Sequence, residues 1–146
     1  MPSELAVHAT HKGGMCFAVD AEKHSTTVDY PLQAGAETAG MRPLEMLLSS
    51  LAGCVGGAMA MTLRRMGQPI TGLEVDVRGQ RRDEHPTVFT QISVDVSVYG
   101  TGVDPAVVSQ ALEQCESRVA PVWAMLKQGT PIKATVRVCD EHGKGA

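Results

Sequence analysis

The chain has 146 residues, 43% of them hydrophobic and 20% charged, which is the composition of a globular protein and the length of a single domain covering residues 1–146. Its formal net charge of -3 provides no basic excess for a phosphate backbone, so nucleic-acid binding is not expected. Aromatic residues make up only 3%, so aliphatic side chains and the eight methionines must build the core.

The first forty residues predict a small sheet followed by a loop. Residues 4–9, 14–20 and 24–30 are short alternating segments separated by turn-forming residues, a pattern typical of a three-stranded meander. Residues 31–41 are rich in glycine, alanine and proline and have no periodicity. The start of the chain has neither the basic residues nor the apolar run of a secretory signal, so we expect a cytoplasmic protein with reduced cysteines.

A long apolar helix is predicted to begin near Pro43 and to stop at Gly67, with Pro69 just beyond it. The stretch from Met46 to Leu63 has 18 residues without a charge, which is the lower limit for a membrane span. The remaining elements are amphipathic strands that need a surface to pack against. We therefore interpret the segment as a core helix of a soluble protein, buried along much of its length, and expect no membrane association.

Gly53, Gly56 and Gly57 lie inside this helix, where each costs about 1 kcal/mol relative to alanine. Such a cost is explained when another backbone approaches the helix closely. We interpret the glycines as the contact surface of a homodimer in which the same helix of a second subunit packs here. A facing sheet in a tightly covered monomer is the alternative.

The second half of the chain predicts two strands, a broken helix and a last strand. Residues 73–78 form a half-buried strand, and a charged connection leads to a longer strand at residues 88–98. One face of that longer strand is predicted to carry Val88, Thr90, Ile92, Val94, Val96 and Val98. Asp104 and Pro105 open a helix that Pro121 interrupts, and residues 132–138 form the last strand. The order βββ-α-ββ-αα-β predicts an α+β fold rather than a doubly wound sheet.

Cys54 occupies the middle of the long helix, where the residues about one turn away are Ser50, Leu51, Gly57 and Ala58. Two interpretations of this thiol stay open. Unpaired cysteine is often buried as a small hydrophobic residue, and in that case Cys54 only packs. The adjacent glycines leave space beside the sulfur, and such space is what a substrate of a reactive thiol requires.

The other three cysteines carry weaker signals, and no C-x-x-C pair is present to suggest zinc. Cys16 and Cys139 alternate away from the apolar positions of their strands and are expected to be exposed thiols. Cys115 lies in the apolar stripe of the second helix, so packing is its first explanation, although a neighbouring helix can bring it near Cys54. The tail from Cys139 to His142 resembles half a metal site. We predict no metal and no cofactor.

Three motifs resemble the OsmC/Ohr family of thiol-dependent hydroperoxide-detoxifying proteins. They are the glycine-rich start at residues 13–17, the helix motif that runs from Pro43 through Leu48 to Cys54, and the broken helix at residues 120–122. The resemblance implies an OsmC-like fold and an intertwined homodimer whose central helices pack together, with the reactive site at the interface. It also implies that Cys54 is the peroxidatic cysteine, which attacks bulky apolar hydroperoxides and becomes a sulfenic acid.

The chain departs from the family at three supporting positions. Ala120 stands where the family has its second cysteine, and Leu44 stands where it has a supporting glutamate. Glu45 is one residue later and points about 100° around the helix. The family's activating arginine has no counterpart before Arg42, which either replaces that cation or simply faces solvent. A thiol without a nearby cation forms little thiolate at neutral pH, so slow chemistry at Cys54 is expected.

Two functions of different classes follow. The first is a role in oxidative stress defence as a one-cysteine peroxidase, in which Cys54 reduces organic hydroperoxides and an external thiol reductant restores it. The second is a non-catalytic protein that binds an apolar small molecule in the interface pocket. The residue chemistry slightly favours the second, and the family resemblance favours the first. The pocket is predicted to include Leu44, Leu51, Gly53 and Gly57, and the supporting residues Glu45, Arg42 and Cys115.

Overall fold

The computed structural model describes residues 3–140, which form two compact units divided between Leu47 and Leu48. The element order is three strands, one long helix, two strands, a broken helical segment and a last strand. This order confirms the predicted βββ-α-ββ-αα-β plan and the α+β class. The intertwined dimer is a property of two chains and stays a prediction.

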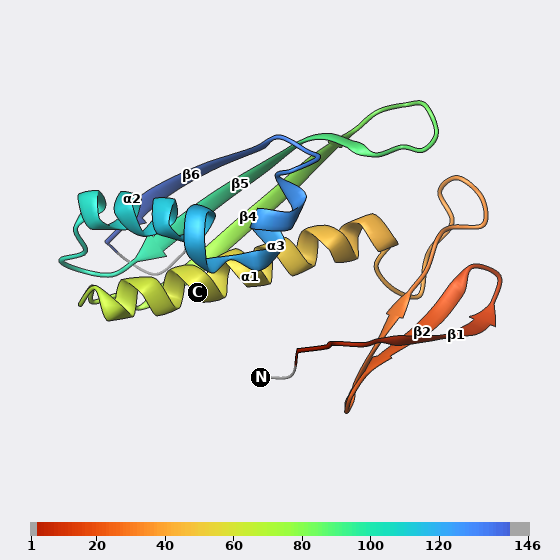
Figure 1. Ribbon diagram of the computed structural model, residues 1–146. Helices are drawn as coiled ribbons and strands as arrows, with labels where there is room; N and C mark the ends of the chain where they lie inside the picture. The colour runs from red at the N-terminus through yellow and green to blue at the C-terminus, as the bar shows by residue number, and fades with distance from the viewer. Residues whose placement is uncertain (1–2, 141–146) are drawn as a thin grey trace. The chain divides into compact units, whose positions relative to one another are not determined.

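The first unit contains an antiparallel meander of β1 (His8–Gly13), β2 (Cys16–Ala21) and β3 (His24–Val28), with β2 in the middle (Figure 1). The predicted first strand at residues 4–9 is wrong in its position. Gly13 and Gly14 adopt positive φ angles of 114° and 56°, and Gly13 pairs with Cys16. Because these glycines make the turn, the chain stays extended through His11 and Lys12, which the sequence placed in a loop.

The register of the meander separates an apolar face from a polar one. Phe17 pairs with His11 on one side and with Val28 on the other, and the rings of His11 and Phe17 lie 5.2 Å apart. Asp20 belongs to the opposite face of the sheet from Val19, because neighbouring residues of a strand point to opposite sides. It pairs with His8 and Ser25. Directly opposed residues share a face of a sheet, so Phe17 and Val28 mark the apolar side.

Helix α1 (Pro43–Arg65) begins as predicted and ends just before Gly67, which has a φ angle of 75°. Proline suits the first helical position because its missing N–H has no partner there. Arg42 precedes it as the N-cap residue, and its backbone N–H donates to Glu45 Oε1 at 2.9 Å. This is the returning half of a capping box, so Glu45 has a structural role at the helix start.

The second unit contains a sheet of β4 (Gly72–Arg81), β5 (Phe89–Tyr99) and β6 (Ile132–Cys139) in that order. β4 and β5 are antiparallel, whereas β5 and β6 are parallel. The parallel pair needs a crossover, which consists of α2 (Pro105–Gln114), the π-helix η1 (Cys115–Val119) and α3 (Pro121–Leu126). Asp104 caps α2 by accepting from the N–H of Ala106 at 2.9 Å.

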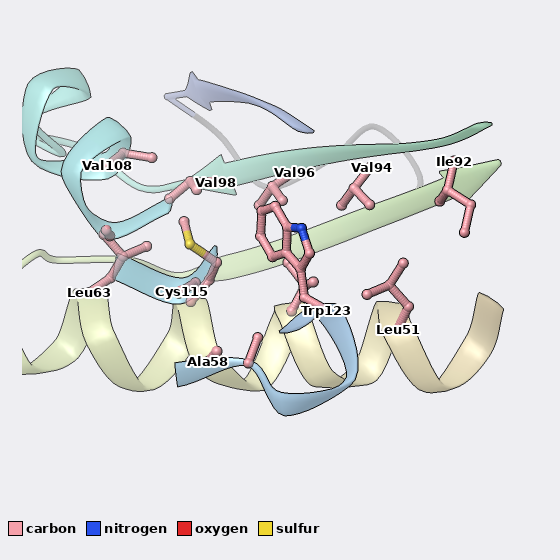
Figure 2. Close-up of a cluster of buried hydrophobic side chains, with 14 of the residues drawn as sticks. Leu51, Ala58, Leu63, Ile92, Val94, Val96, Val98, Val108, Cys115 and Trp123 are labelled. Atoms are coloured by element: carbon pink, nitrogen blue, oxygen red, sulfur yellow. The ribbon is translucent and has the colours of Figure 1, made fainter. Parts of the chain in front are cut away.

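The core of the second unit lies between one face of the sheet and the helices (Figure 2). The predicted face of β5 is confirmed from Ile92 onward, because its alternate residues through Val98 are buried while Val88 and Thr90 are exposed. Trp123 of α3 is 1% exposed and is the largest side chain of the core. The fully or nearly fully buried residues of α1 are Leu51, Val55, Ala58, Met59, Thr62 and Leu63.

Helix α1 is long and apolar enough to cross a membrane by length and composition, with a mean hydropathy of 1.6 over its best window. It packs one face into the core, as the central helix of a globular protein does. The opposite face carries Ser50, Gly53, Gly57 and Met61, which are all exposed. The predicted burial therefore holds for the sheet-facing side of α1 only.

The glycines of α1 differ in their surroundings. A Cβ atom added to Gly53 or Gly57 would meet nothing within 4 Å, whereas one on Gly56 would lie 3.5 Å from Val75 Cγ2. The close approach of a backbone that the sequence suggested is thus not made within this chain at Gly53 or Gly57. The facing sheet accounts for the glycine at position 56, and the homodimer stays a prediction for Gly53 and Gly57.

Candidate functional site

Cys54 lies on α1 at the border between the buried and the open face. Successive residues turn by about 100°, which places Cys54 about 40° from buried Ala58 and about 20° from exposed Met61. Its side chain is half-buried and packs against the edge of the core. Cys54 is therefore neither sealed inside the molecule nor fully in solvent.

Small residues adjoin Cys54 on the open side of the helix. Gly53 and Gly57 leave free volume where other residues would place side chains. Leu51, another predicted pocket residue, is 0% exposed and faces the sheet. Leu44 is half-buried and belongs to the first unit. The predicted pocket stays a prediction.

Cys115 is a buried thiol, in agreement with its prediction as a packing residue. It is 0% exposed, and its Sγ lies 3.9 Å from Thr62 Oγ1 on α1. Burial raises the pKa of the Cys115 thiol, the contact with Thr62 partly opposes that shift, and the charge of Cys54 raises the pKa further.

Trp123 lies in the same core layer as Cys115 (Figure 2). Its indole nitrogen is the buried side-chain polar atom that has no hydrogen-bond partner among residues 3–140. A buried N–H without an acceptor costs free energy, so packing must compensate for it. The chain contains one tryptophan, and this residue therefore reports on the core that surrounds Cys115.

The supporting residues Arg42 and Glu45 lie in the first unit, where they make the helix cap. Among the described residues, the ion pairs join Arg78 to Asp95 at 2.7 Å and Lys127 to Glu116 at 3.9 Å, so Arg42 and Glu45 take part in neither of these two pairs. Assistance of Cys54 by Arg42 or Glu45 stays a prediction.

Cys16 and Cys139 are half-buried, so the prediction that they are exposed is wrong. Cys139 ends β6 beside Tyr99, and its carbonyl accepts from the N–H of Gly100 at 3.0 Å, which ties the strand end to the neighbouring loop. All four cysteines are free thiols. Of the half metal site proposed for the tail, Glu141 and His142 lie outside the described residues, and the described part of the chain contains no cluster of three metal-ligating side chains.

Two grooves, of about 220 and 310 Å³, lie over the sheet face that points away from the core. Arg78 lines both of them, and Cys54 lines neither. In the larger groove, Asp95 accepts from Arg78 at 2.7 Å and from Thr135 at 2.5 Å, and these hydrogen bonds lower the pKa of Asp95. We did not predict this network, although the polar alternate residues of β4, β5 and β6 were its signal.

Comparison with known proteins agrees with this arrangement. The family model of the OsmC-like proteins matches residues 35–135. Protein YhfA of Escherichia coli K12 is 28% identical over 96 residues, which cover 66% of this chain and 72% of YhfA.

Solved structures reproduce the fold at low sequence identity. A hypothetical protein from Aquifex aeolicus VF5 superposes with a TM-score of 0.86 at 22% identity and covers 97% of this chain and 100% of its own. An organic hydroperoxide resistance protein OsmC from Legionella pneumophila superposes with a TM-score of 0.69 at 14% identity and covers 92% of this chain and 97% of its own. With its central helix, its two sheets and the family model matched over more than half of its length, this chain belongs to the OsmC-like protein family.

Proposed function

We propose that this protein is a thiol peroxidase that reduces organic hydroperoxides through Cys54. The thiolate attacks the O–O bond, the alcohol leaves, and Cys54 becomes a sulfenic acid that an external thiol reduces. A cysteine carries this chemistry by itself, so the reaction needs no cofactor. The structural relative from Legionella pneumophila, which is named an organic hydroperoxide resistance protein, supports this class of substrate.

The observation that carries the proposal is the position of Cys54 at the border of the open face of α1. A peroxidatic sulfur must be reachable by its substrate and shielded enough to prefer an apolar one. Half-burial of Cys54 satisfies both conditions, and the free volume at Gly53 and Gly57 adjoins it. Cys115 lies completely inside the core, so it does not meet the first condition.

We propose further that a second copy of the chain completes the site. Gly53, Gly57 and the exposed Met61 form a narrow apolar strip of small or flexible residues on α1. A helix with such a strip can approach an identical helix closely, and the same surface then meets itself across a two-fold axis. Each Cys54 would lie beside that contact, in a crevice that suits an apolar hydroperoxide.

The test is the consumption of cumene hydroperoxide with dithiothreitol as the reductant, compared between the wild type and Cys54→Ser. We expect the Cys54→Ser variant to lose the activity, because a hydroxyl does not attack the O–O bond at neutral pH. Cys139→Ser is the matched control, since it removes another half-buried thiol and should retain the wild-type rate. A Cys54→Ser variant with wild-type consumption would sink the proposal.

A non-catalytic binding protein is the second candidate, and one observation favours it. Ala120 and Leu44 stand at the two positions where the resemblance places a second cysteine and a supporting glutamate, and neither side chain can resolve or support a reactive thiol. In that case the crevice would hold an apolar small molecule and Cys54 would only line it. Titration with an apolar fluorescent probe then gives saturable binding that Cys54→Ser leaves unchanged, together with a thiol that hydroperoxide does not oxidise. Rapid formation of one sulfenic acid per chain contradicts this candidate.

A further inference from the structure

The indole of Trp123 carries a polar group that the core of the second unit does not satisfy. The side chain is 1% exposed, and its Nε1–H has no hydrogen-bond partner among residues 3–140. A buried donor without an acceptor costs free energy, and a phenylalanine would fill a similar volume without that cost. Buried polar groups of folded proteins are almost always paired, so an unpaired one calls for a bound molecule or a functional role.

The surroundings of this N–H are apolar. Figure 2 shows the nitrogen on the side of the ring toward Val94 and Leu51, with Cys115 on the other side. Val94 and Leu51 are both 0% exposed, so solvent does not reach the nitrogen past them. The hydroxyl of Thr62, which is also buried, contacts Cys115 on the far side of the ring and is not a partner of the indole.

A water molecule is poorly suited to this place. A buried water makes about three hydrogen bonds, so it needs several polar partners. On this side of the indole, the backbone carbonyls belong to the ladders of β5 and to the hydrogen bonds of α1, and the labelled side chains are apolar. A molecule with one accepting oxygen on an apolar body is better suited, because it pairs with the one donor and buries its remaining surface against apolar side chains.

The indole lies at the level of Cys54 along α1. In Figure 2, Trp123 lies along α1 between the positions of Leu51 and Ala58, and Cys54 is between these two residues in the sequence. Leu51 and Ala58 are each about one helical turn from Cys54, and they lie about 60° and 40° around the helix from it. Cys54 packs against the edge of the core cluster that contains Trp123. A molecule that enters the core beside Cys54 therefore meets the layer that contains the indole.

We propose that the Nε1–H of Trp123 donates a hydrogen bond to the oxygen of the apolar molecule that binds beside Cys54. The inference rests on the apolar site proposed above and adds the chemistry that the site recognises, which is an apolar body with one accepting oxygen. Alcohols, ketones and organic hydroperoxides share this chemistry. Trp123 is a binding residue in this scheme: it holds the oxygen of the ligand, and no covalent step involves the indole. The inference applies to both candidate functions, because the contact does not require a reactive thiol.

The test uses the nitrogen-15-labelled protein, in which the single tryptophan gives one indole N–H resonance. Cumyl alcohol and cumene are the two probes, because they share a carbon skeleton, differ in one oxygen and do not oxidise thiols. We expect cumyl alcohol to move the indole proton downfield in a saturable way and to shift the backbone amides around Cys54. Cumene should shift those amides without the downfield movement of the indole proton, because it has no acceptor.

The variant Trp123→Phe removes the donor and keeps an aromatic ring. We expect its dissociation constant for cumyl alcohol, measured from the amides around Cys54, to rise about threefold to tenfold, which is the worth of one neutral hydrogen bond. The constant for cumene should stay the same, and this verifies that the variant retains the site. Met125→Ala, on the exposed side of α3, is the matched control and should keep both wild-type constants. If Trp123→Phe loses affinity for both probes, the indole resonance of the wild type decides alone.

The outcomes separate this inference from the functions it rests on. If cumyl alcohol shifts the amides around Cys54 but leaves the indole proton unmoved, the inference is overturned and the ligand site is kept. If neither probe changes the amides around Cys54, both the inference and the ligand site are overturned. A downfield indole shift in a protein that does not consume cumene hydroperoxide supports the inference and contradicts the peroxidase proposal.

Discussion

Each unit of this protein contains a three-stranded sheet with one face that its own unit leaves open, and the two open faces differ in chemistry. On the sheet of the second unit, that face is polar: Asp95 accepts from Arg78 and Thr135, and Arg137 donates to Ser97 at 2.8 Å. The meander of the first unit presents Phe17 and Val28 on one of its faces. One open face is polar, and the other is apolar.

The two units also differ in how many side chains they bury. The second unit has a core of fully buried side chains around Trp123, whereas every residue of β1 is exposed and Val7 just before it is 71% exposed. A three-stranded sheet needs an apolar contact surface to be stable. The second unit thus has a hydrophobic core of its own. For the first unit, we propose that contact with a second copy of the chain stabilises the meander.

The largest effect is expected from removing the centre of the second unit's core. Trp123→Ala should lower the free energy of unfolding by about 3–5 kcal/mol, because the indole is completely buried and leaves a large cavity. Met125→Ala, two residues away and 73% exposed, is the matched control and should change it by less than about 0.5 kcal/mol. Urea unfolding followed by circular dichroism gives both values. Similar losses for both variants would contradict the assignment of the core to the Trp123 side of α3.

The next effect tests whether a second copy covers the apolar face of the meander. Val19→Asp places a charge among the apolar residues of that face, and burying it in an interface costs about 2 kcal/mol or more. We expect the variant to elute as a monomer in size-exclusion chromatography with light scattering while the second unit keeps its Trp123 emission. Ser25→Asp, on the polar face of the same sheet, should leave the dimer unchanged. A dimer that resists Val19→Asp shows that this face is not the contact.

The sequence predicted the second unit better than the first, for physical reasons. The alternation along β5 from Ile92 onward and the signals at Pro43 and Gly67 are local, and the structure has them as predicted. The first strand was misplaced because the turn depends on Gly14, and strand patterns alone do not show which glycine turns. The π-turn at Cys115 also escaped prediction. It follows from Pro121, which disfavours helical geometry at Ala120 and widens the last turn.

The site was predictable to a similar extent. The position of Cys54 on a helix with small neighbours follows from spacing, and so does the packing role of Cys115. What completes the site does not follow, because a second chain adds surfaces that the periodicity of one chain does not describe. Glu45 shows the limit well: the family resemblance made it a candidate to support Cys54, and the structure adds a hydrogen bond from the backbone N–H of Arg42 to its side chain, which the helix start explains.

A smaller effect is expected on the open face of α1. Gly57→Ala should stabilise an isolated chain by about 1 kcal/mol, because alanine favours the helix and its Cβ meets nothing within 4 Å. If α1 packs closely on a second copy, the same methyl group opposes association, so the dimer should dissociate at a higher protein concentration than the wild type. Sedimentation over a dilution series measures this. Gly129→Ala is a suitable control, because Gly129 lies outside α1 and a Cβ there also meets nothing within 4 Å. Gly67→Ala is unsuitable, because the positive φ angle of Gly67 would strain an alanine.

The smallest effect concerns the polar network of the second unit. Hydrogen bonds from Thr135 and Arg78 lower the pKa of Asp95, so the folded state holds the carboxylate form more strongly than the unfolded state does. The stabilisation is therefore present above the pKa of the unfolded chain and is lost as the pH falls through the lowered value. Its size should not exceed about 1 kcal/mol, because the pair is exposed to solvent.

Asp95→Asn should remove that pH dependence and leave the dimer and the thiol chemistry unchanged, since the network faces away from the core. Unfolding free energies measured between neutral and acidic pH for both proteins give the difference, and Glu113→Gln on α2 serves as the exposed control. If Asp95→Asn shifts the monomer–dimer equilibrium as strongly as Val19→Asp does, then the polar face of the second unit is itself a contact surface. In that case the polarity of a sheet face would not predict whether that face contacts solvent or a second copy of the chain.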